Sequence, residues 1–329
     1  MDAFSDILSG VKLNGALYFS ADFSAPWGFS SPPSNTMTLA KVLTPETPHL
    51  VIFHFVIDGE ALVQLADGES AVLNPGDVIV FPHGDAHRMT SGKGASATSE
   101  SAAILSKVKS GDLSPLKAGG GGNTTRFVCG YMACDPYQSR PILSGLPPVF
   151  KVNIRADRSG QWLENSILQL VEEAASGRVG SAAMLAKLSE ALFVDTLRRY
   201  VASLPEQRAG WLAGARDPIV GKCLGLLHGR IADRWTIASL AEEVGISRSG
   251  LVERFTRYLS DPPMTYLTRW RLQTGARWLE RTSKGVAEIA AEVGYESEAA
   301  FSRAFRREYG RPPGQYRRSH RSAKGKLDS

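Results

Sequence analysis

The chain has 329 residues, more than one hydrophobic core usually serves, so its length indicates two or three domains. Hydrophobic residues make up 43% and charged residues 22%, which excludes collagen-like, rod-like and wholly disordered chains. No apolar run in the sequence reaches the roughly 18 residues of a membrane span, and the first ten residues lack a secretory pattern. We therefore expect a cytoplasmic protein that binds no membrane.

Charge is distributed unevenly along the chain. Residues 1–150 carry 9 Lys and Arg against 13 Asp and Glu, whereas residues 210–329 carry 21 against 13. Most of this excess is arginine, whose planar guanidinium group pairs with phosphate oxygens and base edges. The C-terminal third is therefore predicted either to bind a polyanion or to present a basic face to solvent.

Motifs for catalysis are few. Cys129, Cys134 and Cys223 are an odd number of cysteines without close spacing, so they are predicted to be buried thiols, not a disulfide framework or a zinc site. A Ser-His-Asp arrangement, a P-loop and a dinucleotide fingerprint are not evident. We expect neither enzyme activity nor a cofactor.

Strands joined by tight turns are predicted between residues 49 and 89. Asp58-Gly59 and Asp67-Gly68 separate β-rich runs, and Asn74-Pro75-Gly76-Asp77 precedes the apolar residues 78–81. Asp-Gly is a hairpin signal, and in the longer turn proline presets φ while glycine accepts a positive φ. Short strands at this spacing indicate a sandwich or a barrel.

The apolar spacing becomes helical after Trp162. One helix is predicted to end near Gly177 and a second to run from Ser181 to Leu204. Their apolar stripes either cap the β domain or form an antiparallel contact in a homodimer, and the sequence leaves both open. Residues 92–125, which precede them, show no periodicity and are predicted to be a loop between strands.

An internal repeat fills the C-terminal third. Val244-Gly245-Ile246 recurs as Val293-Gly294-Tyr295, and one extra residue, Glu296, then sets the offset at which the copies continue to match. The matched positions are Ser247 with Ser297, Leu251 with Phe301, Phe255 with Phe305, Arg257 with Arg307, and Tyr266 with Tyr316. Each copy predicts a short helix, a glycine turn and a serine-capped second helix, which is the helix-turn-helix arrangement.

The second helix of each copy is predicted to face DNA. Leu251 and Phe255, like Phe301 and Phe305, are i and i+4 neighbours that face inward, so the residues between them face outward. The predicted DNA-binding residues are Ser247, Arg248, Ser249, Val252 and Arg257 in the first copy, and Glu298, Ala299, Ser302, Arg303, Arg306 and Arg307 in the second. Arg303 fits a base contact, and Arg257, Arg306 and Arg307 fit phosphate contacts. The alternative is a helical array that binds protein partners.

A long helix over residues 264–281 is predicted to join the two copies, beginning after Pro262-Pro263. Such a connector fixes the distance between the two second helices. If both helices lie on one face of a duplex, successive major grooves place them about 34 Å apart. One chain is then expected to cover two adjacent major-groove segments.

The last hundred or so residues resemble the AraC/XylS family of bacterial transcription regulators. The resemblance is carried by residues 237–266 and 286–316, especially Arg303-Ala304-Phe305-Arg306-Arg307 and the sequence Gly310-Arg311-Pro312-Pro313-Gly314-Gln315-Tyr316. It implies that both second helices contact promoter DNA, that Arg303 meets bases, and that RNA polymerase is a partner. Glu253 stands where relatives carry arginine, and a carboxylate repels phosphate. The second helix of the first copy is therefore expected to position the protein on DNA more than to read bases.

The N-terminal region resembles the cupin barrels. Pro75-Gly76-Asp77, followed by residues 82–87, is similar to the second cupin motif. The resemblance implies a sensor for an unidentified small-molecule effector, with His54 and His87 as candidate effector-binding residues. Metal-binding cupins use paired histidines two residues apart, whereas His49 and His54 are five apart. We therefore expect no metal, although two imidazoles meeting across a barrel suit a transition metal.

The sequence as a whole predicts an α+β multidomain protein. Its parts are a cupin-like β-barrel sensor domain over 1–155, a helical linker or dimerisation segment over 156–209, an all-α DNA-binding domain with two helix-turn-helix units joined by a long helix over 210–321, and a basic disordered tail over 322–329. The predicted function is sequence-specific regulation of transcription in response to a small molecule. The alternative is a cupin metalloenzyme with a basic helical appendage. Activation and repression are not distinguished.

Overall fold

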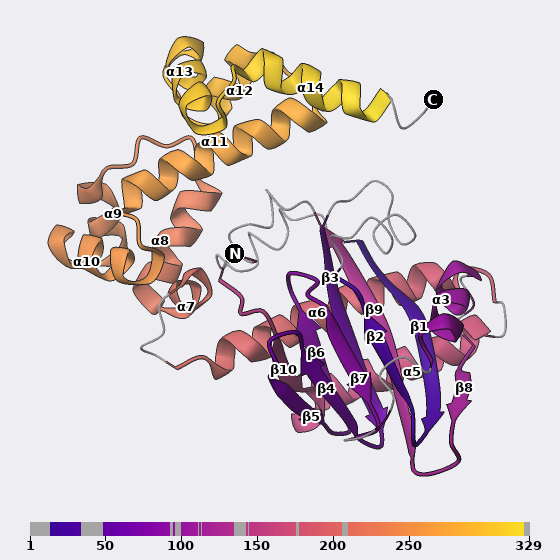
Figure 1. Ribbon diagram of the computed structural model, residues 1–329. Coiled ribbons are helices and arrows are strands. Elements are labelled where there is room, and N and C mark those ends of the chain that lie inside the picture. The colour runs from indigo at the N-terminus through magenta and orange to yellow at the C-terminus, as the bar shows by residue number, and fades with distance from the viewer. Residues whose placement is uncertain are drawn as a thin grey trace. The chain divides into compact units, whose positions relative to one another are not determined.

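The computed structural model describes residues 14–33, 49–92, 95, 100–110, 112, 114–134, 143, 145–175, 178–205 and 210–325. They fall into two compact units, of which the first ends at Ser203 and the second begins at Leu204. In Figure 1 the first unit is rich in strands and the second is helical. Each unit has its own core.

Two sheets form the β part of the first unit. Its strands are β1 (Asn14–Ser24), β2 (Gly28–Ser31), β3 (His49–Asp58), β4 (Ala61–Leu65), β5 (Ser70–Leu73), β6 (Asp77–Phe81), β7 (His87–Thr90), β8 (Leu116–Gly119), β9 (Thr124–Cys134) and β10 (Phe150–Asn153). One sheet has the order β10-β6-β3-β9-β1-β8, and the other has the order β2-β7-β4-β5. The predicted barrel therefore takes the form of two sheets, because no strand pair in the described ranges joins one sheet to the other.

The main core of this unit lies between the two sheets. Alternate residues of a strand share one face, and the inward set is almost fully buried. It includes Phe19, Phe23, Ile52, Val56 and Phe127 from the larger sheet, and Phe29, Val63, Leu73 and Met89 from the smaller one. The three cysteines are buried thiols, as predicted.

Two helices cover the outer face of the larger sheet (Figure 1). They are α5 (Arg158–Ala175) and α6 (Ser181–Ser203), which follow the short 3-10 helix Ile154–Ala156, and α6 packs on β1, β9 and β10. Strands β3 and β6 are therefore buried on both faces, which accounts for their continuous apolar runs. The apolar stripes of both predicted helices lie within this unit, where Ile167 and Leu192 are fully buried.

The prediction of a loop over residues 92–125 is wrong for α3 (Ser101–Ser110), for β8 and for the first two residues of β9. Helix α3 lies beside β2, where the Ser101 hydroxyl oxygen accepts a hydrogen bond from the Ser30 backbone at 3.2 Å. Ile104 and Val108 of α3 pack against the core. This apolar stripe is only two residues long, and serine, glycine and lysine on both sides obscure it in the sequence.

The second unit is built of helices. They are α7 (Trp211–Arg216), α8 (Pro218–Gly229), α9 (Ile237–Val244), α10 (Arg248–Leu259), α11 (Pro263–Arg281), α12 (Val286–Glu292), α13 (Glu298–Tyr309) and α14 (Pro313–Gly325). The pairs α9–α10 and α12–α13 are the predicted helix-turn-helix units, and α11 is the predicted connector. At about 1.5 Å per residue, α11 is roughly 28 Å long. No helix in the described part of the chain is long and apolar enough to cross a membrane.

Local sequence determines both turns. Gly245 and Gly294 adopt φ of 76° and 84°, which side chains with a Cβ rarely tolerate. The hydroxyl oxygens of Ser247 and Ser297 accept hydrogen bonds from the backbone of Gly250 at 3.1 Å and Ala300 at 3.2 Å. The predicted glycine turns and serine caps are confirmed.

Candidate functional site

The outward face of α13 holds six of the predicted DNA contacts. Glu298, Ala299, Arg303, Arg306 and Arg307 are exposed and Ser302 is half-buried, whereas Phe301 and Phe305 lie fully buried beneath them. Among the side chains that the structure describes, no carboxylate lies within 4.0 Å of Arg303, Arg306 or Arg307. All three guanidinium groups are therefore available to an external anion.

The outward face of α10 is less positive. Ser247, Arg248, Ser249 and Arg257 are exposed and Val252 is half-buried. Arg257 forms an ion pair with Glu253 at 3.3 Å, one helical turn away. Both side chains are exposed, so the pair contributes only about 0.3–0.5 kcal/mol and a phosphate can displace it. That α10 positions the protein on DNA more than it reads bases stays a prediction.

Other arginines of the basic third hold the helices together. Arg254 of α10 contacts Asp217 at 2.7 Å, and Asp217 also caps α8 by accepting from the backbone of Ile219 and Val220. Burial raises the pKa of Asp217, but hydrogen bonds from Arg254 and Val220 outweigh burial and hold that pKa below its ordinary value. Sequence reasoning missed this contact; the Asp-Pro sequence signals the start of α8 but not the partner at Arg254. Arg317 likewise donates to the carbonyl oxygens of Leu279 and Lys284.

The two candidate effector-binding histidines meet inside the first unit. Nε2 of His54 lies 2.6 Å from Nε2 of His87, and Nδ1 of His54 lies 2.7 Å from the Cys129 sulfur. His54 is 0% exposed and His87 is 3% exposed. The ring of Phe81 stacks on that of His87 at 3.7 Å between centroids. The sequence suggested the meeting of the two histidines but not the thiol.

Hydrogen-bond chemistry assigns the proton positions in this group. His87 Nδ1 lies 2.9 Å from the Asp85 carbonyl oxygen, which only accepts, so His87 Nδ1 carries a proton. In a neutral ring its Nε2 then accepts from His54 Nε2, and His54 Nδ1 accepts from the Cys129 thiol. Burial lowers the pKa of His87 to about 4. Burial, and then His87, hold the pKa of His54 well below its ordinary value.

The positions of His54, His87 and Cys129 determine whether they can share a metal ion. The Cys129 sulfur and the His87 ring lie at different nitrogens of His54, so these three groups do not converge on one point. Within the described ranges, no group of three or more His, Cys, Asp or Glu side chains is placed to hold an ion. His49, the other candidate, instead contacts the carbonyl oxygen of Pro82 at 2.8 Å.

The buried histidines predict a pH-dependent stability of the first unit. Because the folded-state pKa of His87 is about 4 and its unfolded value is about 6.5, stability is complete above pH 6.5 and declines as the pH falls toward 4. The loss from His87 alone is about 3 kcal/mol. Hydrogen-exchange protection of β3 and β7 measures it.

His87→Gln should flatten this pH profile, whereas His83→Gln, at an exposed histidine, should leave it unchanged. A wild-type profile that is flat between pH 7 and 4 would contradict the assignment of neutral rings.

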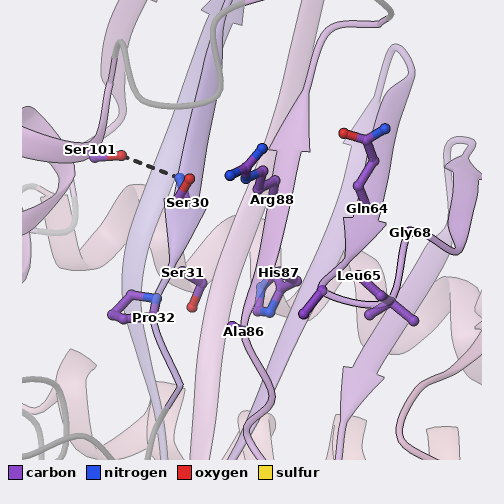
Figure 2. A pocket seen from close by; sticks show the side chains of 11 residues that line it. Ser30, Ser31, Pro32, Gln64, Leu65, Gly68, Ala86, His87, Arg88 and Ser101 are labelled. Atoms are coloured by element: carbon purple, nitrogen blue, oxygen red, sulfur yellow. Dashed lines mark hydrogen bonds between the residues drawn. The ribbon is translucent and has the colours of Figure 1, made fainter.

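A cavity of about 790 Å³ opens at the smaller sheet beside this group (Figure 2). Arg88 on β7 is paired across the sheet with Ser30 on β2 and Gln64 on β4, and all three line the cavity together with His87. In the part of the chain that the structure describes, Arg88 has no carboxylate within 4.0 Å. His54 is not among the lining residues.

The two units together define a two-domain DNA-binding protein, and comparisons with known proteins agree. A family model described as cupin matches residues 2–202, and a model described as a helix-turn-helix domain matches residues 240–319. A putative AraC-like transcription regulator of Streptomyces antibioticus is 30% identical over 97% of this chain and 99% of that protein. The transcriptional regulator AlkR of Acinetobacter baylyi is 25% identical over 96% of this chain and 99% of that protein. The DNA-binding domain of AdpA, solved with a target DNA, is 26% identical with a TM-score of 0.32, and the match covers 33% of this chain and 97% of that domain.

The chain belongs to the AraC-like transcription regulators that carry an N-terminal cupin domain. It is a DNA-binding transcriptional regulator. The resemblances to both families are confirmed, and so is the predicted fold class, with a β-rich part and a helical part that holds two helix-turn-helix units.

Proposed function

We propose that the chain recognises a two-part operator by placing α10 and α13 in successive major grooves. The observation that carries this proposal is the face of α13, where three exposed arginines without acidic partners in the described structure lie on the helix whose other face buries Phe301 and Phe305. Arg303 is the proposed base contact, and Arg306 and Arg307 are the proposed phosphate contacts. Arg248, Ser249, Val252 and Arg257 of α10, with the capping residue Ser247, chiefly position the helix.

Selection of bound sequences from random DNA by the full chain tests this proposal. The expected product has two half-sites about 10 base pairs apart, centre to centre. The affinity for it should fall with salt at a log-log slope of about −0.9 for each phosphate that an arginine neutralises. Recovery of no motif, with binding that depends on salt alone, would reject sequence-specific recognition.

The proposed partners are promoter DNA, RNA polymerase and a small-molecule effector, and the protein has no catalytic role in this account. The relatives are transcriptional regulators, which supports regulation over catalysis. Homodimerisation through the first unit is compatible with the account but is not required, since one chain carries two helix-turn-helix units.

We place the effector in the cavity at the smaller sheet and propose that it is a small anion. Arg88 supplies a positive charge, and Ser30 and Gln64 supply hydrogen-bonding groups on either side of it. Pre-formed concave sites with a few convergent polar groups are typical of ligand binding. His87 lines the cavity, and His54 lies outside the cavity lining and contacts Nε2 of His87.

Thermal unfolding of the first unit with small carboxylates and their neutral amides tests this assignment. An anion at about 100 times its Kd stabilises a protein by about 2.7 kcal/mol. We expect at least one carboxylate, and not its amide, to raise the melting temperature of the wild type, and Arg88→Gln to abolish that rise. An equal response of the Arg88→Gln variant would place the binding elsewhere.

A further inference from the structure

One arginine of the connector contacts the loop that precedes the first helix-turn-helix unit. Arg271 lies on α11, where its Nε donates to the carbonyl oxygen of Ile231 at 2.9 Å and its Nη2 donates to that of Asp233 at 2.6 Å. Both carbonyl groups belong to the loop between α8 and α9. Hydrogen bonds from a charged donor are stronger than neutral ones, so Arg271 anchors this loop on the connector.

The same guanidinium group lies against the turn between α12 and α13, in the second helix-turn-helix unit. A Cβ atom added to Gly294 would come within 2.7 Å of Arg271 Nη2 and within 2.9 Å of the Ala232 Cα atom. The loop between α8 and α9 and the turn between α12 and α13 thus approach each other backbone to backbone. We call the contact among residues 231–233, Arg271 and Gly294 the seam.

The repeat supplies an internal comparison for the seam. Gly245 occupies the equivalent turn between α9 and α10, in the first helix-turn-helix unit. Its φ of 76° is close to the 84° of Gly294. Beyond Gly245 itself and its two chain neighbours, no described atom lies within 4 Å of a Cβ added to Gly245. Both turns need glycine for their φ, but only Gly294 also makes room for a neighbouring unit.

Arg271 supplies the main polar interaction of the seam. Its side chain is half-buried, and burial lowers its pKa, although arginine remains charged at neutral pH. The neighbouring ion pair between Arg234 and Glu296 spans 3.3 Å, but its side chains are 88% and 78% exposed. An exposed pair of this kind contributes little.

We propose that Arg271 sets the separation and relative orientation of α10 and α13, and thereby the half-site spacing that the protein accepts. This inference rests on the proposed function, in which both helices enter major grooves. Once α10 or α13 is bound to its half-site, the other helix binds intramolecularly. Its effective concentration depends on how narrowly the protein restricts the separation and orientation of the two helices. Loss of the seam leaves α11 and the exposed Arg234–Glu296 pair as links between the two helix-turn-helix units, which allows a wider range of separations and orientations.

The test uses the full chain and the two-part site that the wild type selects. Its variants carry one base pair more or fewer between the half-sites, or one scrambled half-site. Arg271→Ala should bind the intact site on the order of tenfold more weakly and bind single half-sites as the wild type does. It should also lose the preference for the original spacing, and Arg271→Lys, which cannot donate in the same planar fork, should behave similarly.

Gly294→Ala and Gly245→Ala form the matched pair. Both variants introduce the same backbone strain at a turn, but only Gly294→Ala places a methyl group in the seam. We expect Gly294→Ala to relax the spacing preference and Gly245→Ala to retain it.

Two results would overturn the inference: an unchanged spacing preference in Arg271→Ala, or an equal loss on intact sites and single half-sites, which indicates a structural role alone. Failure of the wild type to select any two-part site would instead reject the proposed function, and this inference with it.

Discussion

Arg303→Ala is expected to weaken binding to the selected operator by about 1–3 kcal/mol, which is the value of one bidentate contact to a guanine. Arg303 is exposed and lies two residues from each of the buried Phe301 and Phe305, on the opposite side of the helix, so its removal leaves the helix packing intact. Because random DNA offers no fixed guanine at that position, affinity for random DNA should change little. Fluorescence anisotropy with both DNA types measures the difference.

Arg306→Ala is the control for charge. Arg306 is also exposed on α13, and its proposed partner is a phosphate, so its loss should weaken binding to both DNA types alike. The salt slope should become shallower by about 0.9. If Arg303→Ala behaved in the same way as Arg306→Ala, Arg303 would position the helix and read no base.

Phe305→Ala is expected to destabilise the second helix-turn-helix unit by about 3–5 kcal/mol. Phe305 is 0% exposed, and its ring packs against those of Phe301, Tyr309 and Tyr316 with centroids 4.4–5.4 Å apart. Its truncation leaves a cavity in the cluster that joins α11, α12, α13 and α14. Hydrogen-exchange protection of α13 reports this unit separately from the rest of the chain.

Phe305→Leu should cost less than about 1.5 kcal/mol, because a smaller change in volume leaves a smaller cavity. DNA binding by the alanine variant should fall in proportion to the unfolded fraction and recover on cooling to the temperature of maximum stability. Unchanged protection of α13 in Phe305→Ala would contradict the core that the structure assigns to it.

The helical half was predictable because its signals are local and occur twice. Turn glycines, capping serines and i, i+4 apolar pairs each depend on residues within one turn of each other, and the repeat showed them in register. The seam was not predictable, since nothing near Arg271 in the sequence indicates that its partners are the carbonyl groups of Ile231 and Asp233. Such contacts depend on tertiary structure alone.

The β half was only partly predictable, since its sheet depends on contacts between distant segments. Strand β9 lies in the middle of the larger sheet, but Gly130 interrupts its apolar pattern. Phe53 is the register partner of Gly130 on β3, and its ring fills the space that a side chain at 130 would need. Glycine is therefore favourable there because of a residue far away in the sequence. Likewise, His54 and His87 lie in contact, as the sequence suggested. The contact between His54 and Cys129 on β9 was not predicted.

Methylation protection at guanine N7 tests the central claim most directly, because this atom lies in the major groove. The full chain should protect guanines in two major-groove segments on one face of the selected operator, about one helical turn apart. Arg303→Ala should lose protection in one segment only. Protection confined to a single segment, or binding that leaves every guanine N7 reactive, would contradict recognition by both α10 and α13.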